Sequence, residues 1–156
     1  MRGPGSQELI RDCGSPEETA ALAAALGRAA EAGDFLSLVG PLGAGKTLFA
    51  SAFCSALGID PDEVDSPSFV LLNRYEGRLP VFHFDAYRLE GEREELEELG
   101  FFDEDLETGV VLMEWADRLA PWLPERALEI RFEIVGETGR RLILREPGNR
   151  VLEALS

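Results

Sequence analysis

A phosphate-binding loop is the sequence feature that most constrains this chain. Residues 40–47 read Gly-Pro-Leu-Gly-Ala-Gly-Lys-Thr and match the pattern G-x-x-x-x-G-K-[ST] at every fixed position. Lys46 is the only lysine, so every other cationic side chain is an arginine. Its compact ammonium suits contact with the β- and γ-phosphates of a nucleotide. We therefore expect a nucleoside triphosphate site at this loop.

The segments on either side of the loop have the pattern that phosphate-loop chemistry requires. Residues 35–39 form a short apolar run, which predicts a buried strand, and apolar residues recur at helical spacing over 47–57. Glycines between them allow backbone conformations that point N–H groups inward as an anion nest. Lys46 would add a mobile positive charge, and the Thr47 hydroxyl would ligate Mg²⁺. The residues assigned to nucleotide binding here are Leu42, Gly43, Ala44, Gly45, Lys46, Thr47 and Leu48.

Hydrophobic patterning over the rest of the chain predicts further helices and two hairpins. A helix over 15–32 begins with Ser15 as N-cap, Pro16 in the first turn and Glu18 completing a capping box, and ends at Gly33. Strands over 68–75 and 80–85 flank a short turn, and strands over 128–135 and 140–145 flank a second one. The remaining predicted elements are an acidic helix over 92–99, a buried strand over 110–113 and a last helical turn within 149–155.

These elements predict an α/β fold of the phosphate-loop NTPase type, with three layers. Short hairpin turns make neighbouring strands antiparallel, so the central sheet is expected to be mixed parallel and antiparallel and flanked by helices. A length of 156 residues fits a single domain over 1–156, with residues 1–6 expected to be flexible.

Composition limits the compartment and the partners. No apolar stretch is long enough for a membrane span and no signal core follows Met1, so we expect a cytoplasmic protein with Cys13 and Cys54 as free thiols. The net charge of −15 disfavours autonomous nucleic-acid binding. Acidic residues concentrate between Glu90 and Glu107, opposed only by Arg93. That run is either a solvated helix face or a docking surface for a basic partner.

Two acids are candidates for a role at the metal. Asp85 ends the apolar run Val81–Phe84, and Glu114 ends the run 110–113. A carboxylate at the end of a buried strand is the Walker B arrangement, and Mg²⁺ prefers oxygen ligands. His83, the only histidine, shares the strand face of Asp85 by alternation, so it has either a site role or a plain core position. Ser66 and Ser68 carry hydroxyls that would reach the metal or phosphate, unless their segment is only a turn.

The base is predicted from an absence in the sequence. Guanine-specific GTPases read the base with an N-K-x-D loop, whose lysine this chain lacks outside the phosphate loop. Adenine, or weak selectivity, is therefore favoured.

Together these motifs closely resemble the bacterial TsaE family (formerly YjeE), the ATPase of tRNA threonylcarbamoyladenosine biosynthesis. The resemblance is carried, in order, by the loop at 40–47, Ser-Pro-Ser-Phe at 66–69, His-Phe-Asp-Ala-Tyr-Arg-Leu at 83–89 and Glu-Trp at 114–115. It extends from about Ser15 to Arg145. Pro41, Ser68 and Ala116 depart from the residues that are frequent in the family.

The resemblance implies roles for individual residues. Lys46 and Thr47 would hold phosphate and Mg²⁺, Asp85 would be the Walker B aspartate, and Glu114 the second acid near the metal. Ser68 would take a switch-like hydroxyl position and Trp115 would lie beside the nucleotide. The base would sit near Pro16–Thr19 and the turn at Gly139. The expected catalytic residues are Lys46, Asp85 and Glu114, and the expected metal ligands are Thr47, Asp85 and Glu114.

The resemblance also implies partners. The protein would bind ATP and Mg²⁺ and act on a complex of TsaD and TsaB, which modifies adenosine 37 of tRNAs reading ANN codons, so tRNA would be met only through that complex. Two alternatives stay open from the residues alone. One is a small-molecule phosphotransferase with residues 88–106 as its lid. The other is a non-enzymatic module whose shape is set by ATP.

Overall fold

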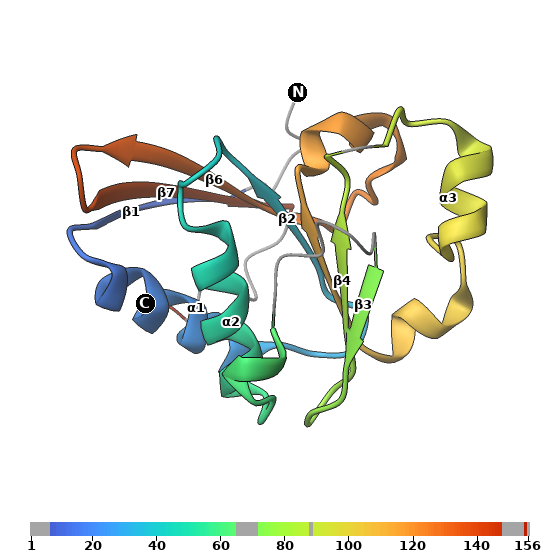
Figure 1. Cartoon of the computed structure of the whole chain (residues 1–156), viewed down its shortest axis with the longest axis horizontal. Coiled ribbons are helices and arrows are strands. Elements are labelled where there is room, and N and C mark those ends of the chain that lie inside the picture. The colour runs from blue at the N-terminus through green and yellow to red at the C-terminus, as the bar shows by residue number, and fades with distance from the viewer. Residues whose placement is uncertain (1–6, 65–71, 88, 148–154, 156) are drawn as a thin grey trace.

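A seven-stranded mixed sheet forms the centre of the molecule (Figure 1). The computed structural model describes residues 7–64, 72–87, 89–147 and 155. The strands lie in the order β1-β7-β6-β2-β5-β4-β3. In chain order they are β1 (Gln7–Cys13), β2 (Phe35–Val39), β3 (Leu72–Tyr75), β4 (Val81–Asp85), β5 (Val110–Glu114), β6 (Leu128–Val135) and β7 (Gly139–Glu146).

Strand pairing confirms the mixed sheet predicted from the sequence. β2 runs parallel to both β5 and β6, and β4 runs parallel to β5. β3–β4 and β6–β7 are the two predicted antiparallel hairpins. Since β2, β4 and β5 are parallel, their carboxyl ends meet at one edge of the sheet, where ligands bind in folds of this class.

Helices cover the sheet on both faces, as Figure 1 shows. The elements are α1 (Pro16–Ala29), α2 (Lys46–Ala56) and α3 (Arg93–Leu99), with short 3₁₀ helices η1 (Pro61–Glu63), η2 (Glu104–Thr108) and η3 (Ala116–Trp122). Side chains of α1 and α2 pack in one hydrophobic cluster with residues of the sheet. Side chains of α3, η2 and η3 pack in a second cluster with the alternate residues of β2, β4 and β5. The molecule therefore has the predicted three layers.

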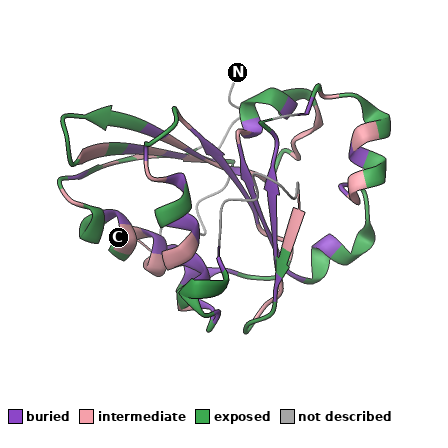
Figure 2. Ribbon diagram, viewed as in Figure 1, coloured by how far each residue is buried: buried purple, intermediate pink, exposed green. Residues whose placement is uncertain are grey.

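The central strands are buried on both faces (Figure 2). Along β4, Phe82 and Phe84 belong to the cluster under α3, whereas Val81 belongs to the cluster under α1 and α2. Strand alternation therefore turns His83 and Asp85 toward the α2 side, and the two share a strand face as the sequence predicted.

The two helices on that side are tightly packed because α1 carries a glycine where α2 approaches. A Cβ at Gly27 would lie 2.5 Å from the carbonyl oxygen of Phe53 and 2.8 Å from Cβ of Ala56. The start of α1 agrees with the prediction at Ser15 but not at Glu18. Ser15 accepts a hydrogen bond from the N–H of Glu18, but the Glu18 carboxylate accepts from the N–H of Gly14 rather than from that of Ser15.

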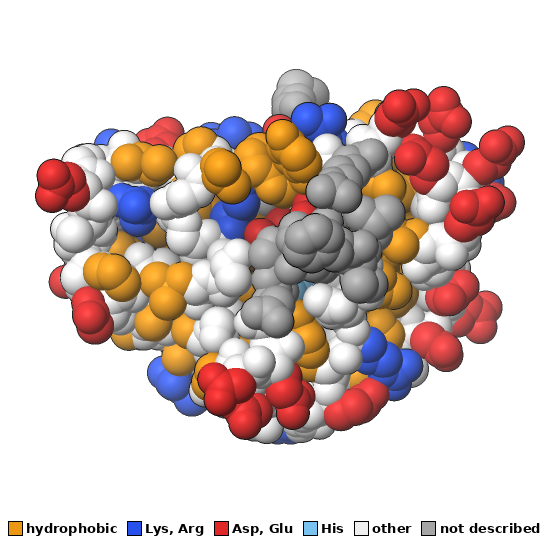
Figure 3. Space-filling view, viewed as in Figure 1, with side chains coloured by type: hydrophobic (Ala, Val, Ile, Leu, Met, Phe, Trp, Pro, Cys, Tyr) orange, Lys and Arg blue, Asp and Glu red, His pale blue; other side chains and the backbone are white. Residues whose placement is uncertain are grey.

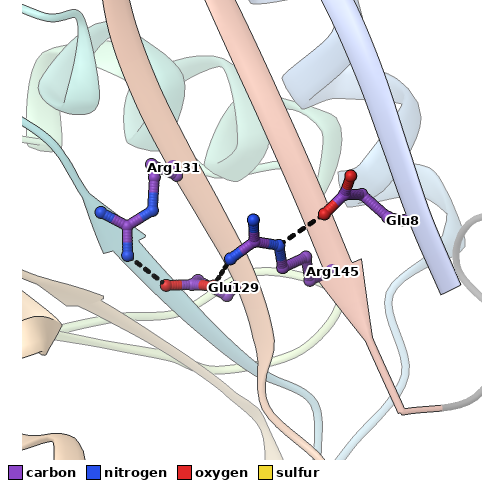
Figure 4. A network of polar contacts seen from close by, with 4 residues as sticks. All are labelled: Glu8, Glu129, Arg131 and Arg145. Carbon is purple, nitrogen blue, oxygen red and sulfur yellow. Dashed lines mark hydrogen bonds and ion pairs between the residues drawn. The ribbon is translucent and has the colours of Figure 1, made fainter. Parts of the chain in front are cut away.

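The outer parts of the sheet have one polar face. Arg145 on β7 forms ion pairs with Glu8 on β1 and Glu129 on β6, and Arg131 pairs with Glu129 (Figure 4). These side chains alternate with buried residues such as Ile130 and Leu144, which face α1 and α2. Ion pairs therefore occupy the face of β1, β7 and β6 that the second helical layer leaves exposed.

The structure differs from the sequence prediction at β1 and at the end of α1. β1 was not predicted, because it is a mostly exposed edge strand with a weak apolar pattern. α1 ends at Ala29 rather than Ala32, and its C-cap is Ala30. The predicted Ser66–Phe69 segment, the start of the strand at 68 and most of the last helical turn lie outside the described residues. Across the described ranges, no helix is both long and apolar enough to cross a membrane.

Candidate functional site

The phosphate-binding loop connects β2 to α2, which is the predicted arrangement. Gly43 and Gly45 have φ angles of 80° and 101°, a region that only glycine adopts readily, and Gly45 is the N-cap of α2. Gly40 has a different reason to be glycine, since a Cβ there would lie 2.9 Å from both Cβ and the carbonyl oxygen of Phe132 on β6. The loop is therefore shaped by its own φ angles and by close contact with β6.

Lys46 lies under the loop and is almost fully buried. Its Nζ atom donates to the carbonyl oxygens of Gly40 and of Pro41, the latter at 3.3 Å. The same atom lies 3.6 Å from the ring centroid of Trp115, a cation–π geometry. Burial lowers the pKa of the Lys46 ammonium, and the nearby carboxylates of Glu114, Asp117 and Asp85 oppose that shift. A cation held this way is poised to meet an anion at the loop.

Asp85 and Glu114 are brought together at the carboxyl edge of the sheet. They are direct register partners on the parallel strands β4 and β5, and both are buried. Burial raises the pKa of Asp85, and the neighbouring Glu114 raises it further, while the N–H of Tyr87, 2.9 Å from Oδ1, lowers it. Two carboxylates in so dry a place favour a cation between or beside them.

The residues present fit Mg²⁺ in their chemistry. Asp85, Glu114 and the exposed Thr47 at the start of α2 offer hard oxygen donors. In the part of the chain that the structure describes, no group of three or more His, Cys, Asp or Glu side chains forms a metal cage. Mg²⁺ in proteins usually keeps several waters and relies on one or two carboxylates plus substrate phosphates.

His83 is buried and contacts the site through Glu114. Its Nε2 lies 2.6 Å from Oε2 of Glu114, and its Nδ1 lies 3.1 Å from the hydroxyl of Tyr75. Tyr75 has no motif signal in the sequence, and only the pairing of β3 with β4 brings it to the histidine.

Trp115 follows Glu114 and has an unusual backbone. Its φ and ψ are 59° and 35°, and among the described residues it alone has a positive φ without being glycine. Its N–H donates to the carbonyl of Leu38 on β2, and its ring lies 5.0 Å from that of the exposed Tyr87. Strained backbone of this kind is often found at functional sites. The contact with Lys46 puts Trp115 beside the phosphate loop, and its place beside a nucleotide stays a prediction.

The two regions assigned to the base also meet in the fold. Thr138, in the β6–β7 turn next to Gly139, donates from Oγ1 to the carbonyl of Gly14, two residues before Pro16. Arg140 on β7 donates to the carbonyl of Gly43 at 3.1 Å and to that of Gly139 at 2.7 Å. The hairpin turn, the start of α1 and the phosphate loop are thus linked. Sequence reasoning missed the contact of Arg140 with the loop, because it joins segments that are far apart in the sequence.

Most of the predicted site residues are therefore grouped at one edge of the sheet. Asp85, Glu114 and Trp115 lie near Lys46 of the loop, while Gly139 lies at the β6–β7 turn, which contacts Gly14 just before Pro16. Leu42 and Leu48 are exposed around the loop. Ser68 lies outside the described residues. The acidic run is elsewhere, since Figure 3 shows its carboxylates gathered over α3 and the segment that follows.

The fold and this site define a phosphate-loop NTPase-like α/β protein, and a crystal structure of YdiB from Bacillus subtilis has the same fold. The two superpose with a TM-score of 0.75 at 32% identity, covering 98% of this chain and 95% of that one. The profile of the family described as threonylcarbamoyl adenosine biosynthesis protein TsaE matches residues 13–142. The chain belongs to the TsaE family.

Curated relatives agree with this assignment. The tRNA threonylcarbamoyladenosine biosynthesis protein TsaE of Bacillus subtilis is 40% identical over 137 residues, which cover 87% of this chain and 84% of that protein. The protein of the same name from Treponema pallidum is 37% identical and covers 82% of this chain and 93% of its own. The Mycobacterium leprae protein is 42% identical, and the match covers 79% of this chain and 81% of that protein.

Proposed function

We propose that this protein binds ATP with Mg²⁺, hydrolyses it, and serves as the accessory ATPase of threonylcarbamoyladenosine formation in tRNA. The observation that carries the proposal is the grouping of Lys46, Asp85 and Glu114 around a glycine loop that opens α2. Membership of the TsaE family supports the role in tRNA modification. The site residues support ATP hydrolysis, because phosphoryl transfer needs an anion nest, a cation and paired carboxylates.

Each residue has a defined task in this proposal. Backbone N–H groups of the loop and the first turn of α2 hold the phosphates. Lys46 exchanges its contacts with the carbonyls of Gly40 and Pro41 for phosphate oxygens. Its ammonium then neutralises the charge of these oxygens while the phosphoryl group is transferred. Thr47 and Asp85 would hold Mg²⁺ with Glu114 beside them, directly or through water, and the ion would neutralise β- and γ-phosphate oxygens. The adenine would lie between the start of α1 and the turn at Gly139.

Hydrolysis by the isolated protein is expected to be slow. Asp85 is followed by Ala86, so the strand end lacks the adjacent glutamate that orients water in many ATPases. Glu114 is the remaining acid for that task, and one of its oxygens is already bonded to His83. A partner that completes the site would accelerate turnover.

The proposed partners are TsaB and TsaD, whose complex transfers threonylcarbamoyl to adenosine 37 of tRNAs reading ANN codons. The net charge of −15 suits a protein that meets tRNA only through that complex. A protein with these partners would act in the cytoplasm.

The test is ATP turnover by the purified chain, alone and then with TsaB, TsaD and tRNA, with Lys46→Ala as the control for contaminating ATPases. A low rate that rises with the complex, together with tRNA modification, would support the proposal. ADP formation that rises only with a small phosphate acceptor would indicate a phosphotransferase instead. Nucleotide binding without turnover under any of these conditions would indicate a non-enzymatic module.

A further inference from the structure

We propose that His83 and Tyr75 are positioning residues that fix the carboxylate of Glu114 for metal binding. The inference rests on the proposed function, in which Glu114 lies beside the Mg²⁺. It concerns residues that touch neither nucleotide nor metal and act only through Glu114. Their place is a hydrogen-bonded chain across three adjacent strands, from Tyr75 on β3 through His83 on β4 to Glu114 on β5.

The chain is buried along its whole length. His83 is 0% exposed, Glu114 3% and Tyr75 5%. Water therefore does not replace a contact that is lost, and each polar atom depends on its protein partner. Hydrogen bonds in a dry interior hold the side chains that they join in one rotamer more strongly than exposed hydrogen bonds do.

Hydrogen-bonding capacity sets the direction of the bond to Glu114, and the bond to Tyr75 follows from the state of the ring. An ionised carboxylate only accepts, so Nε2 of His83 carries the proton that is shared with Oε2 of Glu114 over 2.6 Å. In the neutral ring Nδ1 then accepts, and the hydroxyl of Tyr75, 3.1 Å away, donates to it. Tyr75 is thus a partner for Nδ1 in the tautomer that His83 needs in order to donate to Glu114.

The bond from His83 fixes one of the two carboxylate oxygens of Glu114. Oε2 accepts from His83, so Oε1 is the oxygen with both lone pairs open to a metal or to its water. Without His83 the side chain would rotate, and it would lie as a buried carboxylate beside Asp85, its register partner. Outer contacts of this kind typically change metal affinity by about 10- to 100-fold when removed.

A merely structural role for the same chain is a distinct alternative. His83 and Tyr75 would then only join β3, β4 and β5, and their loss would lower stability without changing metal affinity in the protein that remains folded. Three variants separate the two roles. His83→Leu removes both bonds, His83→Gln retains an N–H that can reach Glu114, and Tyr75→Phe removes one hydroxyl. Phe84→Leu is the matched control, since Phe84 is a fully buried neighbour on the other face of β4.

The experiment measures Mn²⁺ affinity in the presence of ADP by electron paramagnetic resonance, and ADP affinity in EDTA. We expect His83→Leu to weaken Mn²⁺ binding by roughly 10- to 100-fold and Tyr75→Phe by a smaller factor, with His83→Gln recovering part of the loss. ADP affinity in EDTA should stay unchanged in all of them. Phe84→Leu should unfold at a lower temperature but bind Mn²⁺ like the wild type.

Equal Mn²⁺ affinity in folded wild type, Tyr75→Phe and His83→Gln would overturn the inference even if His83→Leu failed to fold. Failure of the proposed function would look different. In that case the wild-type protein itself would bind no ADP, or would bind ADP with no associated Mn²⁺, and the inference would fall with it.

Discussion

The Nζ atom of Lys46 lies 3.6 Å from the centre of the Trp115 ring, at the junction of α2 and the end of β5. The contact joins the residue that would bind phosphate to the one non-glycine residue of the described chain with a positive φ. Since Lys46 also donates to Gly40 and Pro41, its move toward a phosphate would change the surroundings of the indole.

Trp115 fluorescence should therefore report nucleotide binding. We expect ATP or ADP to change the emission of the wild type and of Trp122→Phe, because Lys46 leaves the ring face when it meets phosphate. Trp115→Phe should give no such change, since Trp122 instead donates to the carbonyl of Gly91 near α3. Fluorescence titration of the three proteins checks this, and an unchanged signal in Trp122→Phe at saturating ATP would contradict it.

Lys46→Ala should abolish ATP hydrolysis. The variant loses the only cation of the loop, and the expected fall in rate is at least on the order of 100-fold. Stability should not fall in parallel, because burial lowers the pKa of this ammonium and its charged form is therefore held at a cost. Turnover and thermal unfolding measured on the same preparation test both parts. A hydrolysis rate equal to that of the wild type would remove the loop from the mechanism.

Asp85→Asn should separate activity from stability. The pKa of Asp85 is raised by burial, so between the ordinary value of 3.8 and its folded value the native state binds more protons than the unfolded state. Stability then falls as pH rises through that window, and the loss persists at pH 7. Asn keeps the acceptor for the Tyr87 N–H and does not titrate.

We therefore expect Asp85→Asn to unfold at an equal or higher temperature than the wild type at pH 7, with Mg²⁺-dependent hydrolysis lower by on the order of 100-fold. At a pH below 3.8 the difference in stability should disappear. Calorimetric scans across this pH range provide the measurement. A variant that is clearly less stable at pH 7 would show that the carboxylate stabilises the fold.

Arg140 and Arg141 form a matched pair of adjacent arginines with opposite orientations. Arg140 donates to the carbonyl of Gly43 in the phosphate loop, whereas Arg141 pairs with Asp12 on the other face of β7. Arg140→Ala should weaken ATP binding by about tenfold, because the loop loses its link to the β6–β7 turn. Arg141→Ala should leave affinity unchanged. Isothermal titration calorimetry of ATP binding to both variants tests this prediction. Equal ATP affinities would mean that Arg140 does not position the loop.

The parts of the fold that the sequence predicted are those with strong local signals. The glycine loop, the apolar runs of β2 and β5 and the two hairpin turns predicted the mixed sheet, and alternation placed His83 beside Asp85. β1 was missed because an edge strand with one neighbour needs few apolar residues. Tyr75 and Arg140 were missed for another reason, since their roles depend on strand pairing and on contacts between distant segments.

Cys54 gives a prediction about reactivity under alkaline conditions. The side chain is fully buried on α2, and burial raises the pKa of its thiol to about 12. The thiolate is the reactive form, so at pH 8 the folded protein should react with a disulfide reagent only as fast as it opens. Cys13→Ser isolates this thiol, because Cys13 is the other free cysteine.

We expect Cys13→Ser to react slowly with 5,5′-dithiobis(2-nitrobenzoic acid) in native buffer and rapidly in guanidinium chloride. The raised pKa also means that the native state binds more protons than the unfolded state between pH 9.0 and about 12, so stability should fall as pH rises through that window. In Cys54→Ala this part of the loss of stability at alkaline pH should be absent. Rapid stoichiometric labelling of native Cys13→Ser would show instead that the α1–α2 interface opens readily.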